Sequence, residues 1–202
     1  MTTFLAGLSG LGFGLSLIIA IGAQNAYVLR QGLRREHVAP VVIVCAVSDL
    51  VLICAGVAGM GALVTQVPGL LALIRWGGAA FLLGYAILAA RRALRPGALS
   101  TDSTGASAGW LKVVGTAAAL TWLNPHVYLD TVILLGSVAS SHAPHQWPFA
   151  AGASLGSIVW FTALGFGSRH LRRFFAKPAA WRVLDAVIAV VMAVLGVRLL
   201  LG

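Results

Sequence analysis

The sequence predicts an all-α integral membrane protein with six transmembrane helices arranged as an inverted 3+3 repeat. Of the 202 residues, 59% are hydrophobic and only 9% are charged, whereas soluble domains carry about 25% charged residues. Six apolar segments each have roughly the 20 residues that a helix needs to cross a bilayer. They cover residues 4–29, 38–64, 69–90, 111–139, 147–168 and 182–201.

The connections between these segments are short and polar and contain no soluble domain. The longest of them, residues 93–110, contains a Pro-Gly pair and a run of Ser, Thr, Asp and Gly, a composition typical of a flexible linker. We therefore expect a first three-helix repeat at residues 1–92, a cytoplasmic linker at 93–110 and a second three-helix repeat at 111–202. Together they form one membrane domain.

Basic residues gather in alternate connections. Twelve of the 14 Lys and Arg residues lie in or beside the first, third and fifth connections. By the positive-inside rule these connections face the cytoplasm, so both termini lie outside and the chain crosses six times. Contact of these side chains with anionic lipid headgroups accounts for the net charge of +9 without a nucleic-acid partner.

The first apolar segment leaves an alternative open, because it contains Gly7, Gly10, Gly12 and Gly14. Such a segment can re-enter instead of spanning, which would leave five crossings and a cytoplasmic amino terminus. Small-residue faces such as Gly10 and Gly14 also permit a homodimer, although they serve packing within the chain equally well.

A weak internal repeat relates the two halves. The sequence AQNAYVL at 23–29 resembles LNPHVYL at 123–129, and SDLV at 48–51 resembles GSIV at 156–159. The third and sixth segments share a Leu-Gly pair, at 83–84 and at 195–196. Three crossings per unit is an odd number, so the second unit is inverted relative to the first. Inverted repeats with interrupted polar helices are typical of secondary transporters with a site near the bilayer midplane.

The fourth segment is interrupted by the polar stretch TWLNPHVYLD at residues 121–130. Pro125 removes one backbone hydrogen bond of a helix, and polar side chains here have no lipid partner. A substrate site at a broken helix is our main interpretation, and a polar contact between helices is the alternative. Trp122 and Trp160 fall mid-span and are expected to pack against neighbouring helices.

Acidic residues within the apolar segments mark a candidate site. Asp49 lies 12 residues beyond His37, or ~18 Å along a helix, which places it near mid-membrane. An intramembrane carboxylate indicates function by default because an unpaired charge there is costly. The alternative is an ion pair with Arg75, which also lies at a similar depth to Asp130 and could serve as a gate. Asp185 follows Arg182 by three residues, and we expect an interfacial pair.

Three motifs resemble those of the lysine exporter (LysE) family of bacterial basic amino-acid exporters. They are IGAQNAYVLRQG at 21–32, SDLVLI at 48–53 and TWLNPHVYLDT at 121–131. The similarity covers nearly the whole chain, and the third motif is the most specific. The first motif has Ala23 where some members have proline, which predicts a softer helix break at Gly22.

The resemblance implies a transporter, not an enzyme, that exports L-arginine or L-lysine across the bacterial inner membrane by proton antiport and needs no cofactor. Carboxylates would hold the positive groups of such a substrate, and side-chain amides with freed helix N–H groups would receive its carboxylate. Desolvation favours the protonated form of a carboxyl group, so Asp49 or Asp130 is the candidate proton carrier. The predicted substrate-binding residues are Gln24, Asn25, Asp49, Asn124, Tyr128 and Asp130.

The sequence gives less support to other functions. No phosphate-binding loop for ATP is present. Export of another small amino acid, a cation or a metal ion is possible in principle, but two aspartates without a Cys or His cluster make a poor metal site. Residues 152–156 match the Gly-x-Ser-x-Gly pattern of hydrolases. Because this segment is apolar, a small-residue packing face explains the pattern better than a hydrolase that uses Ser154 and His126.

Overall fold

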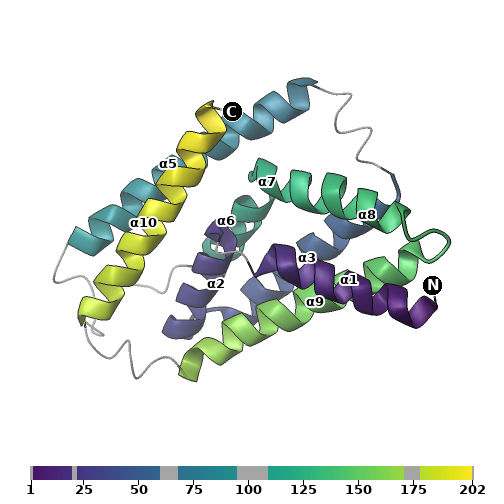
Figure 1. The fold of residues 1–202 in the computed structure, drawn as a ribbon. Helices are drawn as coiled ribbons and strands as arrows, with labels where there is room; N and C mark the ends of the chain where they lie inside the picture. The colour runs from purple at the N-terminus through teal and green to yellow at the C-terminus, as the bar shows by residue number, and fades with distance from the viewer. Residues whose placement is uncertain (1, 20–21, 60–67, 95–108, 171–177, 202) are drawn as a thin grey trace.

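The structure is a computed structural model that describes residues 2–19, 22–59, 68–94, 109–170 and 178–201. Within these ranges the chain forms helices and no strand, which confirms the all-α prediction. Figure 1 shows the helices gathered around the two interrupted segments. Most of the predicted linker, from residue 95 to residue 108, lies outside the described residues, as do the basic residues between 171 and 177.

Four helices are long and apolar enough to cross a bilayer, and a bent helix pair makes a fifth candidate. The bent pair is α1 (Thr3–Ile18) with α2 (Ala23–Arg34). The four long helices are α3 (Val38–Val57), α5 (Pro68–Leu94), α9 (Gln146–Gly167) and α10 (Pro178–Leu201). The remaining predicted crossing, the fourth segment at 111–139, is divided into shorter helices instead of forming one long helix.

The first interruption turns the chain by 84° between α1 and α2. At the start of α1 the Thr2 hydroxyl accepts a hydrogen bond from the Leu5 N–H at 3.3 Å, which caps the helix. Gly22, in an extended conformation, precedes the first residue of α2. That helix ends where Arg35 adopts a left-handed conformation with φ 57° and its N–H bonds to the Gln31 carbonyl.

The second interruption divides residues 110–140 into α6 (Trp110–Trp122), α7 (Pro125–Val127), the π-helix η1 (Tyr128–Leu135) and α8 (Gly136–Ser140). Because proline lacks an N–H group, it is suited to the first turn of a helix, where N–H groups have no intrahelical partner. Asn124 supplies the cap, because its side-chain oxygen accepts a hydrogen bond from the His126 N–H at 3.2 Å. A π-helix is uncommon and is frequently found at functional sites.

Glycines let α1 lie against α9 with their backbones in contact. A Cβ atom added to Gly10 would meet the Phe149 carbonyl, and one added to Gly152 would meet the Gly7 carbonyl. The same holds at Gly14, where an added Cβ would lie 2.9 Å from the Cα of Ala153. These small-residue faces therefore serve packing within the chain, as is common between membrane helices.

Substituting Gly10 by alanine is expected to destabilise this contact, and substituting Gly12 is not. Both glycines lie in α1, but a Cβ at Gly12 would have no atom within 4 Å. Overpacking costs about 1–3 kcal/mol, whereas alanine at an open helix position is favoured by up to ~1 kcal/mol. Thermal unfolding in detergent checks this difference, and equal midpoints for the two variants would contradict the packing described here.

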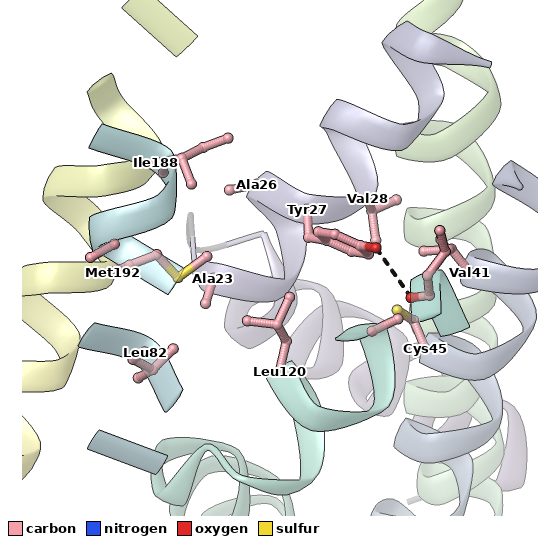
Figure 2. Packing of buried hydrophobic residues seen from close by; sticks show 14 of the residues in the cluster. Ala23, Ala26, Tyr27, Val28, Val41, Cys45, Leu82, Leu120, Ile188 and Met192 are labelled. Carbon is pink, nitrogen blue, oxygen red and sulfur yellow. Dashed lines mark hydrogen bonds between the residues drawn. The ribbon is translucent and has the colours of Figure 1, made fainter. Parts of the chain in front are cut away.

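Helices α5 and α10 lie side by side, as Figure 1 shows. A Cβ added to Gly196 of α10 would lie 2.8 Å from Leu83 of α5. A buried apolar cluster joins this pair to the rest of the molecule, and in Figure 2 Ile188 and Met192 of α10 face the alanines of α2. Tyr27 lies in the same cluster and donates a hydrogen bond to the Val113 carbonyl of α6 at 3.1 Å.

A buried ion cluster also joins α10 to its neighbours, and it corrects the prediction for Asp185. The Asp185 side chain is only 1% exposed and lies 3.1 Å from Arg30 of α2 and 3.3 Å from Arg92 of α5. The predicted partner Arg182 instead donates to the carbonyl of Ala93 at 3.1 Å. The interfacial pair is therefore wrong, because the partners of Asp185 come from helices that are distant in sequence.

Candidate functional site

A cavity of about 290 Å³ lies where the two interrupted segments meet. Its volume is near the lower end of the ~300–1,000 Å³ range of small-molecule sites. The lining comes from both sides of the first break, from α3, from the second broken segment, and from α9 and α10. The lining residues are Leu17, Ile18, Gly22, Ala23, Gln24, Asn25, Asp49, Asn124, His126, Val127, Asp130, Thr131, Phe161, Leu195 and Arg198.

Five of the six predicted substrate-binding residues line this one cavity, and so does the predicted break residue Gly22. They are Gln24, Asn25, Asp49, Asn124 and Asp130. The structure thus brings together residues that are up to 106 positions apart in the sequence (24 to 130). Pro125, the other predicted break residue, begins α7 at the edge of this region.

Asp49 reaches the cavity from the middle of α3. Its side chain is 6% exposed, and one carboxylate oxygen accepts a hydrogen bond from the Ser157 hydroxyl of α9 at 2.7 Å. Ser157 is itself fully buried. In the described part of the chain Asp49 makes no ion pair. A buried carboxylate with one neutral partner attracts a cation strongly, because few water molecules screen its charge.

Asp130 also lines the cavity, from the first turn of η1, and is exposed. His126 also lines the cavity, four residues earlier. The Nε2 atom of His126 is buried and makes no hydrogen bond within the described ranges. Carboxylates therefore enter the cavity from both halves of the chain, one from α3 and one from η1.

Asn25 holds the first helix break together. Its side-chain NH₂ donates to the Ile18 carbonyl at 2.6 Å, and its side-chain oxygen accepts from the Trp160 indole N–H at 3.1 Å. The carbonyl at the end of α1 is thereby satisfied, and the start of α2 is tied to α9. Trp160 was predicted to pack, but its indole also has this polar role.

The second break is held by a comparable set of polar contacts. The Trp122 indole N–H donates to the Ser48 hydroxyl of α3 at 3.0 Å, and the Tyr128 hydroxyl donates to the Trp122 carbonyl at 2.9 Å. Tyr128, unlike the other predicted binding residues, does not line the cavity. Its hydroxyl group satisfies a carbonyl at the end of α6.

Arg75 is not beside either aspartate. Its Nε donates to the Leu199 carbonyl at 2.6 Å, and its Nη2 donates to the Leu200 carbonyl at 2.9 Å. These carbonyls belong to the last turn of α10, where a positive charge is favourable. The predicted pairing of Arg75 with Asp49 or Asp130 is absent from this structure, and the guanidinium caps a neighbouring helix instead.

Arg198 and His126 line the cavity but were not among the predicted binding residues. Arg198 is in the last turn of α10 and, with Leu195, lines the cavity. Its position in the sequence held a clue, because Arg75 and Arg198 are the two basic residues outside the basic connections. The face of α10 that meets the cavity could not be inferred from the sequence, so Arg198 was not assigned to the site.

The family described as LysE type translocator matches residues 15–202. The chain belongs to the LysE family. This confirms the resemblance that three sequence motifs indicated. A Mycobacterium tuberculosis protein named as a candidate amino-acid transporter is 51% identical, with 88% of each chain covered. Proteins named lysine exporter from Corynebacterium diphtheriae and Corynebacterium efficiens are 36% and 37% identical over 96% of this chain and 98% and 97% of their own. No solved structure matches the chain.

LysE-family membership makes this chain a membrane transport protein rather than an enzyme. In the described ranges no group of three or more His, Cys, Asp and Glu side chains is placed to hold a metal ion. Ser154 is buried in α9, and Gly152 beside it lies against the backbone of α1, so this pattern forms part of a helix interface.

Proposed function

We propose that this chain exports L-lysine and L-arginine from the bacterial cytoplasm in exchange for protons. The observation that carries the proposal is the presence of Asp49 and Asp130 in one cavity between two broken helices. Charged side chains within a membrane segment are costly and are kept where they bind substrates, ions or protons. Two carboxylates favour a substrate with two positive groups, which a basic amino acid has and a neutral one lacks.

The relatives support this choice of substrate. The Corynebacterium proteins are named lysine exporters, and the three family motifs of this chain contribute residues to the cavity. In the complex we assign the positive groups of the substrate to Asp49 and Asp130. The amides of Gln24 and Asn124 are suited to form hydrogen bonds with its carboxylate. Asn25 has a supporting role, because both ends of its amide are engaged by Ile18 and Trp160.

Proton exchange fits the energetics of exporting a cation. Moving one positive charge against an inside-negative potential costs about 2.3 kcal/mol per 100 mV. Inward movement of one proton cancels that charge, so the pH gradient and the substrate gradient remain. A carboxyl group that is alternately enclosed and exposed to water can bind and release this proton. Asp49 is the candidate carrier because it is the more deeply buried of the two aspartates in the cavity.

For the architecture we propose six crossings built from inverted repeats, residues 1–92 and 111–202 with the linker 93–110 between them. Corresponding residues of two symmetry-related units can touch only beside the symmetry axis. Asp49 and Ser157 occupy corresponding positions of the repeat motifs and are hydrogen-bonded to each other. The two Leu-Gly pairs also meet, although not residue on corresponding residue, because Gly196 lies against Leu83. Both contacts support a two-fold relation between the halves.

The orientation we propose places the basic end of the helices in the cytoplasm. The ends of α2 and α9 lie together, because Gly32 lies against Gly165 and Ser168. Arg34, in the last turn of α2, and Arg169, just after α9, therefore share one side. At the other end, Thr3 lies 3.4 Å from His145. The positive-inside rule then puts both termini outside the bacterial inner membrane.

Transport by purified protein in liposomes tests the function. Proteoliposomes loaded with radiolabelled lysine or arginine are expected to release it faster when a pH gradient drives protons the opposite way. An ionophore that collapses the gradient is expected to remove the difference. Release at the same rate with and without the gradient would overturn proton antiport, and no release of either amino acid would overturn the substrate.

A further inference from the structure

The cavity holds a third ionised side chain, Arg198, opposite in sign to Asp49 and Asp130. We propose that Arg198 receives the α-carboxylate of the substrate and thereby selects amino acids over the corresponding amines without a carboxylate. This inference rests on the proposed function, because it names the partner of one substrate group in the same cavity.

Arg198 is exposed, and it differs from Arg30, Arg92 and Arg75 in having no partner among the residues that the structure describes. Arg30 and Arg92 are paired with Asp185, and Arg75 is bonded to two carbonyls of α10. Within the described ranges Arg198 makes neither an ion pair nor a hydrogen bond. Its guanidinium group is therefore available to a ligand, with five N–H donors.

The position of Arg198 on α10 directs it to the cavity. Residues three apart share a helix face, and Leu195 and Arg198 both line the cavity. Arg198 is exposed, as are Val194 and Val197, so its place in the cavity lining and not burial associates it with the site. A lipid-anchoring arginine near a helix end would extend away from the protein toward the headgroups. Arg198 shares its face with a cavity-lining leucine, which favours a ligand over the bilayer surface.

The three charges of the cavity mirror those of a basic amino acid. Lysine carries an α-ammonium, a carboxylate and a side-chain ammonium. Asp49, Arg198 and Asp130 supply two negative groups and one positive group, so each substrate charge has one opposite charge in the cavity. A neutral amino acid leaves one aspartate unpaired, and a diamine leaves Arg198 unpaired beside a cation. Both mismatches leave a charge of the cavity without its opposite charge, which lowers affinity.

A guanidinium group is well suited to this role. It binds a carboxylate through two parallel hydrogen bonds, stays charged at all physiological pH values and is less strongly hydrated than an ammonium group. Among the side chains that line the cavity, Arg198 is the one that is always cationic. The amide of Asn25, an earlier candidate for the substrate carboxylate, is already bonded to Ile18 and Trp160.

Comparison of lysine with cadaverine, its decarboxylated analogue, tests the proposal. Binding of each to wild-type protein in detergent is measured by displacement of radiolabelled lysine or cadaverine. The wild type is expected to bind lysine at least about 10-fold more tightly than cadaverine. Arg198→Gln is expected to weaken lysine binding by about 10- to 100-fold, the range for a hydrogen bond to a charged group. Cadaverine binding should stay the same or become tighter.

Two further variants serve as controls. Arg198→Lys keeps the charge but loses the paired hydrogen bonds, so its loss of lysine affinity should be smaller than that of Arg198→Gln. Arg182→Gln removes an exposed arginine from the same helix, outside the cavity, and should leave both affinities unchanged. Cadaverine binding by Arg198→Gln also reports that this variant is folded.

The outcomes separate this proposal from the proposed function. Wild-type protein that binds cadaverine as tightly as lysine would overturn the role of Arg198. Equal weakening of both ligands in Arg198→Gln would overturn it too, because a general electrostatic or structural effect does not distinguish them. If the wild type binds neither lysine nor arginine, that result overturns the proposed function and this inference together.

Discussion

Replacing Asp49 by asparagine is expected to lower lysine and arginine efflux by about 100-fold or more. The substitution keeps the shape of the side chain but removes a charge that is 6% exposed and central to the cavity. Loss of one partner of a desolvated charge pair costs about 2–5 kcal/mol, and every 1.36 kcal/mol is a factor of ten in rate. Efflux of preloaded radiolabelled substrate from cells without their own exporters measures the effect.

Two further variants show how the effect of Asp49→Asn is to be interpreted. Ser157→Ala removes the hydroxyl that donates to Asp49 but keeps the carboxylate, so we expect a loss of about 5- to 10-fold, since such bonds contribute roughly 1–1.5 kcal/mol. Asp130→Asn should also abolish efflux if both carboxylates hold the substrate. All variants are first shown to insert normally. Unchanged efflux in both aspartate variants would reduce these residues to structural roles.

Replacing Asp185 by asparagine is expected to cause the largest loss of stability of any single substitution proposed here. Asp185 is 1% exposed and is the counter-charge for Arg30, which is itself buried. Removing it leaves a buried guanidinium group unpaired, which costs about 3–5 kcal/mol. For a chain of this length that corresponds to a fall in thermal midpoint of roughly 10 °C. Thermal unfolding in detergent provides the measurement.

Arg92, the second arginine of the cluster, makes the loss of stability in Asp185→Asn smaller but does not abolish it. Arg92 has other support, because its guanidinium lies 5.4 Å from the centre of the Tyr85 ring and its side chain is 30% exposed. The double substitution Arg30→Gln with Asp185→Asn should therefore recover part of the stability lost in the single variant, which a double-mutant cycle quantifies. An Asp185→Asn variant as stable as Arg182→Gln would show that the cluster contributes little.

Local patterns in the sequence were sufficient to predict where most of the long helices lie. Continuous apolar runs predicted α3, α5, α9 and α10 to within a few residues at most ends, although α3 ends at Val57 and not near residue 64. The two interruptions could also be predicted, because Gly22 and Pro125 disrupt helices by known backbone effects. The π-helix at Tyr128–Leu135 could not, since its sequence looks like an ordinary apolar helix.

Contacts between helices decided which side-chain predictions failed. Asp185 was assigned to Arg182 because the two lie one turn apart, but three-helix packing brings Arg30 and Arg92 closer. Arg75 was assigned to an aspartate by depth alone, and depth does not determine which neighbouring helix the side chain meets. Asp49 could be predicted because an isolated carboxylate in an apolar segment indicates a site whatever its neighbours are.

The packing of α1 on α9 has a consequence for biosynthesis. Gly10 contacts Phe149, so roughly 140 residues must be made before the first helix meets its partner. At about 5–20 residues per second the ribosome needs roughly 10–30 s for this. During that time Arg30 of α2 has no counter-charge, because Asp185 is made still later. Helix α2 is therefore a poor candidate for stable insertion by itself. Helix α1 is thus made long before the helix against which it packs in the folded protein.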